Sequence, residues 1–525
     1  MAEQILSADL AIGIDGLFGS KNPAQLPPSA LVTADNITYI DGTLKKEGGA
    51  VKYNSTAISG SPSILAGFDW WPNTSTQRAV ILTSAGSILK DSGTGTFPVT
   101  LKSGLSVAAP FGTFVAGGKE AAANNRKLFC FTGTDPVQVL SGDGVTTADI
   151  SGPPTDWSGS NQPIGGVIHS DRLWGFGNLN DPHRLYYSGT SNHETVSSTR
   201  PVYPGVGERI LAAFSMRGFI IVFKFPSGIF SIDTRDASDA NWRTDKISDD
   251  IGIAGIGAAV LAERSIIFMD SGGNLQLIEQ VTTDAFGIQN LGNVALIKSF
   301  INSNLNLGEL DNCKAVFYPK DREIHFAVPH TGSGVNTRRL VVDMNREQMR
   351  FRYSTRDIPV SMWRRKVANS PRLAMGDNIG FVWDLDQAIR SKDGAGYNML
   401  FESSPNDLAY IDPQFSGRRK NGKFLEMIFE PAGNHNVSVV VLWDGVAEAT
   451  YSFDMTGATS GFILGAGILG TGVLGAGAIL ASIRKRITGS GKRIALRVSN
   501  SGADQNISLS KFILHFTLSD QRANI

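Results

Sequence analysis

The sequence contains few cysteines and little charge. Only Cys130 and Cys313 occur among 525 residues, so disulfide bonds do not hold the chain together and no paired zinc ligands are present. Cys130 lies in an apolar run, which predicts a buried thiol in a chain that folds in a reducing compartment. Charged residues make up 18% of the chain, with 48 basic and 48 acidic side chains. A net charge of zero argues against a protein whose whole surface grips nucleic acid or an anionic membrane.

The sequence also lacks the short motifs that mark the commonest enzyme classes. There is no HExxH motif, no Walker-type phosphate loop and no GxSxG nucleophile elbow. His169 and Asp171 form the pair closest to a catalytic dyad, and His183 follows in the next turn. Polar side chains in turns are the better interpretation of these residues. We therefore predict that the protein is not an enzyme and has no catalytic, cofactor or metal site.

Glycine, in contrast, is abundant. It contributes 58 residues, about 11% of the chain, against ~7% in average proteins. A hydrophobic fraction of 42% supports large cores and excludes global disorder. Low charge together with frequent glycine is typical of a β-rich protein with many tight turns.

One segment has the length of a membrane span but not its composition. Residues 457–483 carry no charge and precede the basic cluster at 484–486. Three near-copies of a five-residue unit begin at Ile463, with six glycines in fifteen residues, and each glycine disfavours a helix by roughly 1 kcal/mol relative to alanine. We expect a glycine-rich segment packed on protein and sheltered in an oligomer, not a membrane span. The N-terminal residues have no basic region, so no secretory signal is expected.

A repeat becomes visible when the apolar runs that begin with arginine are aligned. Successive runs start 45 to 58 residues apart, and most are followed by a turn and a second short apolar run. Hairpins with this period are typical of four-stranded propeller blades, and glycine and asparagine supply the positive φ that the turns need. The runs start at Arg78, Arg126, Arg172, Arg217, Arg264, Arg322 and Arg372.

We therefore predict an all-β fold with a six- or seven-bladed β-propeller over residues 61–405. Stacking blades around an axis buries both faces of each sheet and leaves only short edges exposed. The longest step between repeats indicates a helical insertion near residues 284–310. Apolar residues fall near helical spacing there, namely Val294, Ile297, Phe300, Ile301 and Leu305.

The pattern changes after about residue 405. Alternating apolar runs predict an additional C-terminal antiparallel β-sandwich-like domain over residues 406–525, which contains the glycine-rich segment. Residues 1–60 are predicted to form an N-terminal arm and strands that join the propeller.

Stretches at both ends and in the middle of the chain resemble bacteriophage β-propeller tail proteins. At the N-terminus these are Asn22-Pro23, Leu26-Pro27-Pro28, Ala34-Asp35-Asn36-Ile37 and Asp41-Gly42-Thr43-Leu44-Lys45. In the middle it is the hairpin from Arg172-Leu-Trp-Gly to Arg184-Leu-Tyr-Tyr-Ser. Near the C-terminus they are Phe462-Ile-Leu-Gly, Val473-Leu-Gly and Gly489-Ser-Gly-Lys-Arg-Ile-Ala-Leu-Arg-Val. The best-known members are the tail nozzle, or DNA-stabilising, proteins of short-tailed phages.

The resemblance implies a structural protein of the virion tail, made in the host cytoplasm, with no catalytic residues to carry over. It implies a homo-oligomeric ring, a hexamer, that continues the DNA channel below the portal and adaptor and contacts other tail proteins. Genomic DNA would pass through this ring without sequence-specific binding. The ring would help to retain the genome and later to release it.

An alternative function is a glycan-binding or glycan-cleaving propeller at the tail tip, because propellers support many unrelated functions. Trp70, Trp71 and Trp174 would supply stacking surfaces, although tryptophan in a blade is more often a core residue. Basic clusters at 364–366, 418–420 and 484–486 are candidate phosphate contacts, although such clusters are more often solvated loops.

Overall fold

A computed structural model describes most of the chain. The described residues are 4–519, apart from 12, 14, 20, 21, 41, 94, 108–111, 119–125, 143–145, 199–200, 294–296, 346–348 and 457–479. Most of the predicted glycine-rich segment 457–483 therefore lies outside the described residues.

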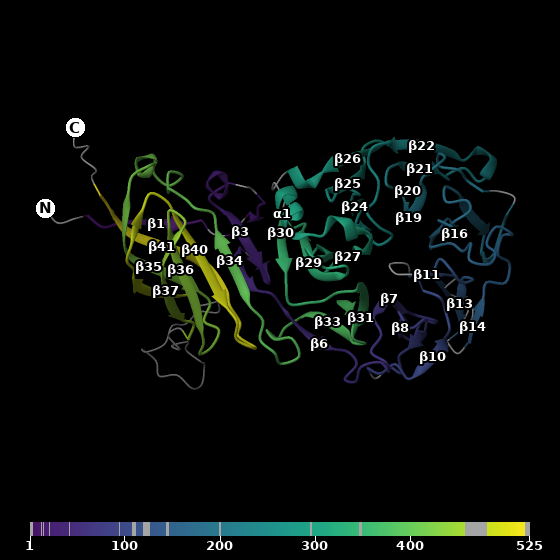
Figure 1. Cartoon of the computed structure of the whole chain (residues 1–525), viewed down its shortest axis with the longest axis horizontal. Helices are drawn as coiled ribbons and strands as arrows, with labels where there is room; N and C mark the ends of the chain where they lie inside the picture. Colours follow the sequence, from purple (N-terminus) through teal and green to yellow (C-terminus); the bar gives the residue numbers. More distant parts are fainter. Residues whose placement is uncertain are drawn as a thin grey trace.

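Six separate four-stranded antiparallel sheets form the blades of a propeller (Figure 1). Blades one to three are β7 (Ile64–Trp70), β8 (Arg78–Thr83), β9 (Ile88–Lys90) and β10 (Val99–Lys102); β11 (Thr113–Gly117), β12 (Lys127–Phe131), β13 (Gln138–Ser141) and β14 (Thr146–Asp149); and β15 (Gly165–His169), β16 (Arg172–Phe176), β17 (Leu185–Gly189) and β18 (Asn192–Val196). Blades four to six are β19 (Arg209–Met216), β20 (Phe219–Phe225), β21 (Ile229–Asp233) and β22 (Arg243–Ser248); β23 (Ala259–Ala262), β24 (Ser265–Met269), β25 (Leu275–Gln280) and β26 (Phe286–Asn290); and β31 (Ser361–Val367), β32 (Ser370–Gly376), β33 (Val382–Gln387) and β6 (Gly49–Lys52).

A further group of four strands stands between blades five and six. It consists of β27 (Lys314–Tyr318), β28 (Glu323–Pro329), β29 (Asn336–Asp343) and β30 (Arg350–Ser354), and β27 contacts both β23 and β31. This group does not form a sheet of its own, because it continues into a ten-stranded sheet. The ring closes where β31 of blade six contacts β7 of blade one.

The arginine-led repeat corresponds to one position in the fold. Each of the seven runs contains the second strand of a four-stranded group, from β8 at Arg78 to β32, which contains Arg372. The sequence has seven repeats but the propeller has six blades. The difference is the four-stranded group that contains Arg322, because its strands β27–β30 belong to the ten-stranded sheet. The predicted fold class is confirmed as a six-bladed propeller with additional sheets.

Two larger sheets form the second part of the molecule. The ten-stranded sheet continues from β30 through β3 (Ala30–Asp35), β34 (Met399–Ser403), β40 (Ile494–Asn500), β36 (Asn436–Trp443) and β37 (Val446–Asp454), with β2 (Gly16–Leu17) beside β3. The seven-stranded sheet contains β38 (Ala481–Arg486), β35 (Lys420–Phe429), β41 (Ser508–Leu518), β5 (Thr43–Lys46), β4 (Ile37–Ile40), β1 (Leu6–Leu10) and β39 (Ser490–Gly491).

These two sheets pack face to face as a sandwich. Alternate residues of β35, including Leu425 and Met427, are buried in one apolar cluster with alternate residues of β36, including Val437 and Val439. The alternation predicted for a half-buried strand is therefore present in both sheets. The same apolar cluster continues into blades three to five, so the sandwich and the propeller share a core.

Helical structure is sparse in the described part of the chain. The α-helix α1 (Ile297–Asn304) lies within the predicted insertion range 284–310 and buries Ile297 and Ile301. Short 3-10 turns occur at η1 (Pro23–Gln25), η2 (Asp239–Asn241), η3 (Leu291–Asn293), η4 (Leu307–Asn312) and η5 (Pro413–Phe415).

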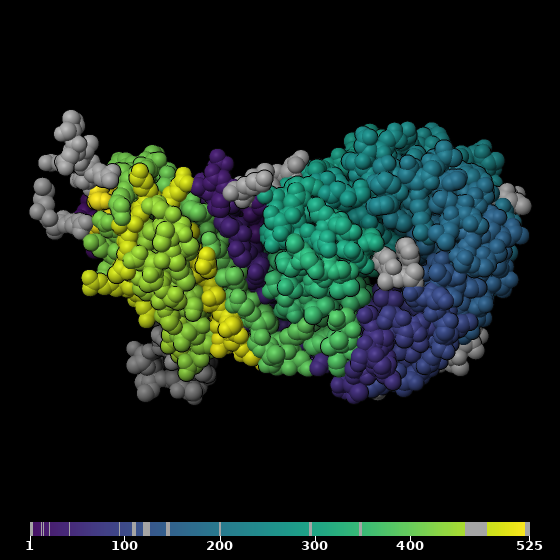
Figure 2. All heavy atoms as spheres, in the orientation of Figure 1, coloured from purple at the N-terminus to yellow at the C-terminus, as the bar shows by residue number. Residues whose placement is uncertain are grey.

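The propeller is inserted between the N-terminal and C-terminal strands of the sandwich. Strands β1–β5 belong to the sandwich, the chain then enters the propeller at β6, and it returns to the sandwich at β34. The two parts lie side by side in an elongated molecule, with the ends of the chain at the sandwich and β3 between them (Figures 1 and 2). Of the predicted N-terminal range 1–60, only β6 enters a blade, because β1–β5 belong to the two larger sheets.

Candidate functional site

The place where the propeller meets the sandwich contains a set of buried charges, here called the junction network. At its centre is Glu47, in the crossing from β5 to β6, which is 1% exposed. Its Oε1 atom lies 2.9 Å from Nη2 of Arg339 and 2.5 Å from Nη1 of Arg352. Glu47 therefore joins the incoming chain to β29 and β30. The network contains Glu47, Glu323, Asp357 and Asp386 with Arg339, Arg352 and Arg356.

The remaining members extend the network to blade six and to β28. Arg352 Nη2 lies 2.6 Å from Glu323 Oε2, and Arg356 Nη2 lies 3.1 Å from Asp386 Oδ1 in β33. Burial opposes ionisation of Glu323, but Arg352 and then His325 outweigh it and lower the pKa of Glu323 to about 2. Burial likewise opposes ionisation of Glu47, yet the nearby guanidinium groups hold its pKa well below the ordinary range. The guanidinium groups therefore hold Glu47 and Glu323 in their ionised form although both are buried.

Asn36 fixes the same junction through hydrogen bonds. It follows β3 directly, has a φ of 53° and is 1% exposed. Its Oδ1 atom accepts hydrogen bonds from the backbone N–H groups of Thr355 and Arg356 at 2.9 and 3.3 Å. Its Nδ2 atom donates to Asn398 O at 2.6 Å. One side chain thus connects β3, the segment after β30 and the segment before β34, and asparagine tolerates the left-handed conformation better than most residues.

The junction network orients the sandwich on the propeller. Hydrogen bonds and ion pairs are directional, so they specify one orientation of the sandwich on the propeller, which apolar contacts alone do not. The β3–β30 pairing at Asp35 and Tyr353 adds a backbone link across the same boundary. The propeller and the sandwich are therefore linked at this boundary by ion pairs, side-chain hydrogen bonds and a backbone pairing.

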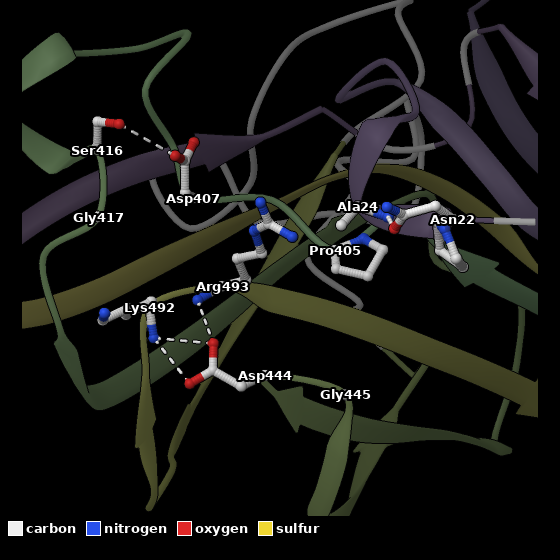
Figure 3. Close-up of a pocket in the computed structure, with 11 residues that line it drawn as sticks. Asn22, Ala24, Pro405, Asp407, Ser416, Gly417, Asp444, Gly445, Lys492 and Arg493 are labelled. Carbon is white, nitrogen blue, oxygen red and sulfur yellow. Dashed lines mark hydrogen bonds between the residues drawn. The ribbon is translucent and has the colours of Figure 1, made fainter.

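A depression lies at one end of the sandwich (Figure 3). It has a volume of about 690 Å³, and Asp407, Asp444, Lys492 and Arg493 are its charged lining residues. Asp444 accepts hydrogen bonds from the backbone N–H groups of Lys492 and Arg493 at 2.8–3.1 Å, and Asp407 accepts one from Ser416. Both carboxylates therefore hold loops in place. The lining contains no histidine or cysteine that would serve as a base or nucleophile.

The histidines considered in the sequence do not form a dyad with Asp171. His169 is buried and its ring nitrogens lie 2.7 Å from Ser215 Oγ and 2.5 Å from Thr234 Oγ1, so it joins blade three to blade four. Burial lowers the pKa of His169 to about 4, which keeps it neutral. Asp171 instead lies 3.3 Å from His193 Nε2. His183 packs against the ring of Tyr203.

The tryptophans proposed as stacking surfaces divide into two groups. Trp70 and Trp174 are 1% and 0% exposed, and Trp174 packs on Tyr187 and Trp242 with ring centroids 4.8 and 5.3 Å apart. They are core residues and offer no surface to a ligand. Trp71 remains partly exposed beside the basic cluster at 364–366, where Lys366 Nζ lies 5.5 Å from its ring centroid.

The other basic clusters have different environments. Lys420 is fully buried, and its Nζ donates to three backbone carbonyl groups, those of Phe415, Arg418 and Lys492, at 2.8–3.0 Å. Burial lowers its pKa to about 8. Residues 484–486 lie on the exposed edge strand β38, where charge discourages pairing with another strand. Cys130 and Cys313 are both buried and free.

Sequence analysis missed Glu47, Arg339, Arg352 and Asp357. Their charges are spread over more than 300 residues of sequence, and neither spacing nor local composition brings them together. Asn36 was included only in a resemblance motif. The positions that would have given a hint are the charged residues on strands otherwise rich in apolar side chains, such as Arg339 in β29.

The described residues contain neither a group of metal ligands nor a membrane-spanning helix. No three His, Cys, Asp or Glu side chains are grouped so that they would hold a metal ion in this part of the chain. None of its helices has the length and apolar character needed to span a bilayer.

No family model and no curated protein matches the chain. Among solved structures it is similar to BamB from Moraxella catarrhalis, with a TM-score of 0.38 and 12% identity over 67% of this chain and 94% of that one. It is similar to the Cps50 (Swd1) β-propeller domain of Myceliophteria thermophila, with a TM-score of 0.41 and 10% identity over 64% and 99%. For YCF48 from Cyanidioschyzon merolae the TM-score is 0.39, with 9% identity over 64% and 98%. These similarities concern the β-propeller fold alone.

Proposed function

We propose that the protein is a structural component of a bacteriophage tail, the nozzle ring that continues the DNA channel below the portal and adaptor. The resemblance of its sequence motifs to phage tail propellers suggests this role. The structural observation that supports it best is the rigid connection between propeller and sandwich through the ten-stranded sheet and the junction network.

A rigid two-part subunit suits a closed ring. A head-to-tail ring closes only if each subunit is rotated by the same fixed angle relative to its neighbour. A flexible joint between two parts of the subunit would let that angle vary, so a ring of six copies would close poorly. The buried charges at the junction prevent this movement, because separating them from one another exposes uncompensated charge.

The charge balance agrees with a channel that DNA must pass through. The chain has no net charge, so it lacks the long-range attraction that would hold a polyanion on its surface. In this role the protein retains the genome with the help of its ring contacts to the adaptor and other tail proteins, and releases it at infection. No catalytic step is required.

An electron-microscopy reconstruction of virions that contain this chain tests the proposal. We expect a closed ring of six copies around an axial channel below the portal. A peripheral position, as a fibre or at a tip without an axial channel, would contradict it.

Virions that carry Glu47→Gln provide a second test of the role of rigidity. We expect fewer filled particles and faster loss of packaged DNA on mild heating than in virions with the control Asp249→Asn, which changes an exposed carboxylate. Equal DNA retention in the two would show that the junction network is not needed by the ring.

A further inference from the structure

A depression at the closing seam of the propeller has the properties of a ligand site, here called the seam site. It has a volume of about 410 Å³, within the size range of small-molecule sites. Strands β7 and β31 provide most of it, and these are the contacting strands of blades one and six. The lining residues are Phe68, Asp69, Trp363, Arg364, Arg365, Lys366, Asn369 and Pro371.

The backbone presents the basic cluster at one end of this seam. Arg364 and Lys366 are exposed residues near the end of β31, just before the hairpin turn at Ala368 and Asn369, where φ is 47° and 67°. The corresponding end of β7 carries Asp69. The seam site therefore opens on the propeller face formed by the turns between first and second strands.

The seam site contains more hydrogen-bond donors than acceptors. Trp363 is 6% exposed, and its indole N–H is buried without a partner among the described residues. The Nε–H group of Arg365 is also buried without a partner there. The guanidinium group of Arg364 is exposed and makes no hydrogen bond or ion pair with a described residue. Buried polar groups are normally paired, so the two enclosed donors are unusual. The exposed Arg364 is the donor that a ligand would reach directly.

The indole is held in place by close packing. A side chain at Gly67 of β7 would place its Cβ atom 2.4–2.5 Å from the Trp363 ring, so only glycine fits beneath it. The Trp363 ring is therefore packed directly against the backbone of β7 at the seam.

The charges leave one net positive charge for a ligand. Arg365 Nη1 lies 3.0 Å from Asp384 Oδ1, so these two charges offset each other. Asp69 accepts hydrogen bonds from Gln77 Nε2 and from the backbone N–H of Lys366, each at 2.7 Å, and remains one negative charge beside Arg364 and Lys366. A singly charged carboxylate matches this balance better than a phosphate dianion, which Asp69 would also repel.

The remaining lining residues indicate which kind of molecule the carboxylate is attached to. Phe68 and Pro371 offer apolar surface, while Asn369 and Asp69 supply groups that exchange hydrogen bonds with hydroxyls. We propose that the seam site binds an acidic sugar ring of the uronic-acid class, with its carboxylate on Arg364 and its ring against Phe68. This site is independent of the tail-nozzle role, and either proposal can fail without the other.

Three ligands with the same pyranose ring distinguish a carboxylate site from a neutral-sugar site and from a phosphate site. They are methyl β-glucuronide, methyl β-glucoside and glucose 6-phosphate. Titration of the full chain labelled with ¹⁵N-tryptophan follows the indole N–H signals, and Trp363→Phe identifies the one from Trp363. We expect the glucuronide to shift this signal saturably, with an apparent Kd at least tenfold lower than that of either other ligand. Arg364→Gln should raise the glucuronide Kd at least tenfold.

Arg322→Gln is the matched control, because Arg322 occupies the corresponding hairpin but pairs with Glu263 on the surface, 2.9 Å away. We expect it to bind the glucuronide as the unmodified protein does. Equal binding of the neutral glucoside would overturn the carboxylate assignment, and tighter binding of glucose 6-phosphate would replace it with a phosphate site. Absence of any shift, or an Arg364→Gln variant that binds normally, would refute the seam site.

Discussion

The interior of a blade and the interior of the junction have opposite compositions. In blade four, Ile220, Ile221 and Val222 of β20 are completely buried among apolar neighbours. At the junction, Glu47, Arg339 and residues around them are equally buried but charged. Apolar burial is strong and non-directional, so it holds a repeated unit together wherever the units stack. Ion pairs and hydrogen bonds have geometry, so they suit a boundary that must adopt one orientation.

This difference in composition also predicts how substitutions, pH and salt affect the stability of each region. A blade loses packing in proportion to the volume removed, whatever the pH or salt concentration. The junction loses much more when one charge is removed, because its partner is left buried and unpaired. The predictions below test this contrast, in order of decreasing effect.

Replacing Glu47 with glutamine should have the largest effect. The substitution keeps the shape of the side chain and removes the carboxylate that Arg339 and Arg352 share, while Asp357 and Glu323 still face them. We therefore expect a loss at the lower end of the range for breaking a buried ion pair, about 3 kcal/mol in the free energy of unfolding. Denaturant unfolding followed by tryptophan fluorescence and circular dichroism measures it. Asp249→Asn, at an exposed ion pair, should change stability by less than ~0.5 kcal/mol. Equal effects of the two variants would show that the junction charges contribute no more than surface ones.

Two substitutions of Asn36 separate the contribution of its hydrogen bonds to stability from the contribution of its backbone conformation. Asn36→Gly keeps the positive φ accessible but leaves the N–H groups of Thr355 and Arg356 unpaired, which should cost about 2 kcal/mol. Asn36→Ala adds the strain of a left-handed residue, for about 1 kcal/mol more. Urea unfolding of both variants checks the difference. If alanine proves as stable as glycine at this position, the conformational part of the argument is wrong.

The blades could be predicted from the sequence, whereas the junction could not. Blades one to five are each built from contacts within about 50 residues, so the arginine-led runs and their turns mark them locally. Blade six is marked only in part, because its fourth strand β6 comes from the N-terminal region. The sequence does not reveal that β27–β30 continue into another sheet, because the link depends on Asp35 meeting Tyr353 across more than 300 residues. For the same reason, Glu47 looks like an ordinary charged turn residue until β29 and β30 are placed beside it.

Part of the seam site could be predicted from the sequence. The basic cluster at 364–366 is visible as a candidate anion contact, and Trp71 as a candidate aromatic surface. What the sequence could not show is that ring closure brings β31 beside β7, nor that Trp363 has a buried N–H without a partner. Trp174, by contrast, was a candidate stacking residue that the fold uses entirely for packing.

Asp35 provides a charge at the junction boundary whose effect depends on pH. Burial raises its pKa to about 6, with Arg338 acting in the opposite direction. Between about pH 4 and 6 the folded state retains a proton that the unfolded chain has released, so stability falls as the pH rises through this window. Asp35→Asn should therefore be more stable than the unmodified protein at pH 7, by up to about 2 kcal/mol after allowing for partial exposure, and equally stable below pH 4. Unfolding measured from pH 4 to 7 tests this; a difference independent of pH would contradict it.

The smallest predicted effect belongs to the blade interior. Ile221→Val removes one methylene group from a completely buried site in β20, which should cost about 1 kcal/mol. Because no charge is involved, this loss should stay the same between pH 3 and 8 and between low and high salt. The Glu47→Gln loss should instead shrink below about pH 4.5, where Glu47 of the unfolded chain takes up a proton and Glu47 of the folded protein does not. Ile379→Val, at a position 51% exposed, controls for the substitution itself and should be nearly neutral. A pH-dependent Ile221→Val effect would mean that the blade core is coupled to the junction charges, and the contrast between the two regions would then be one of degree.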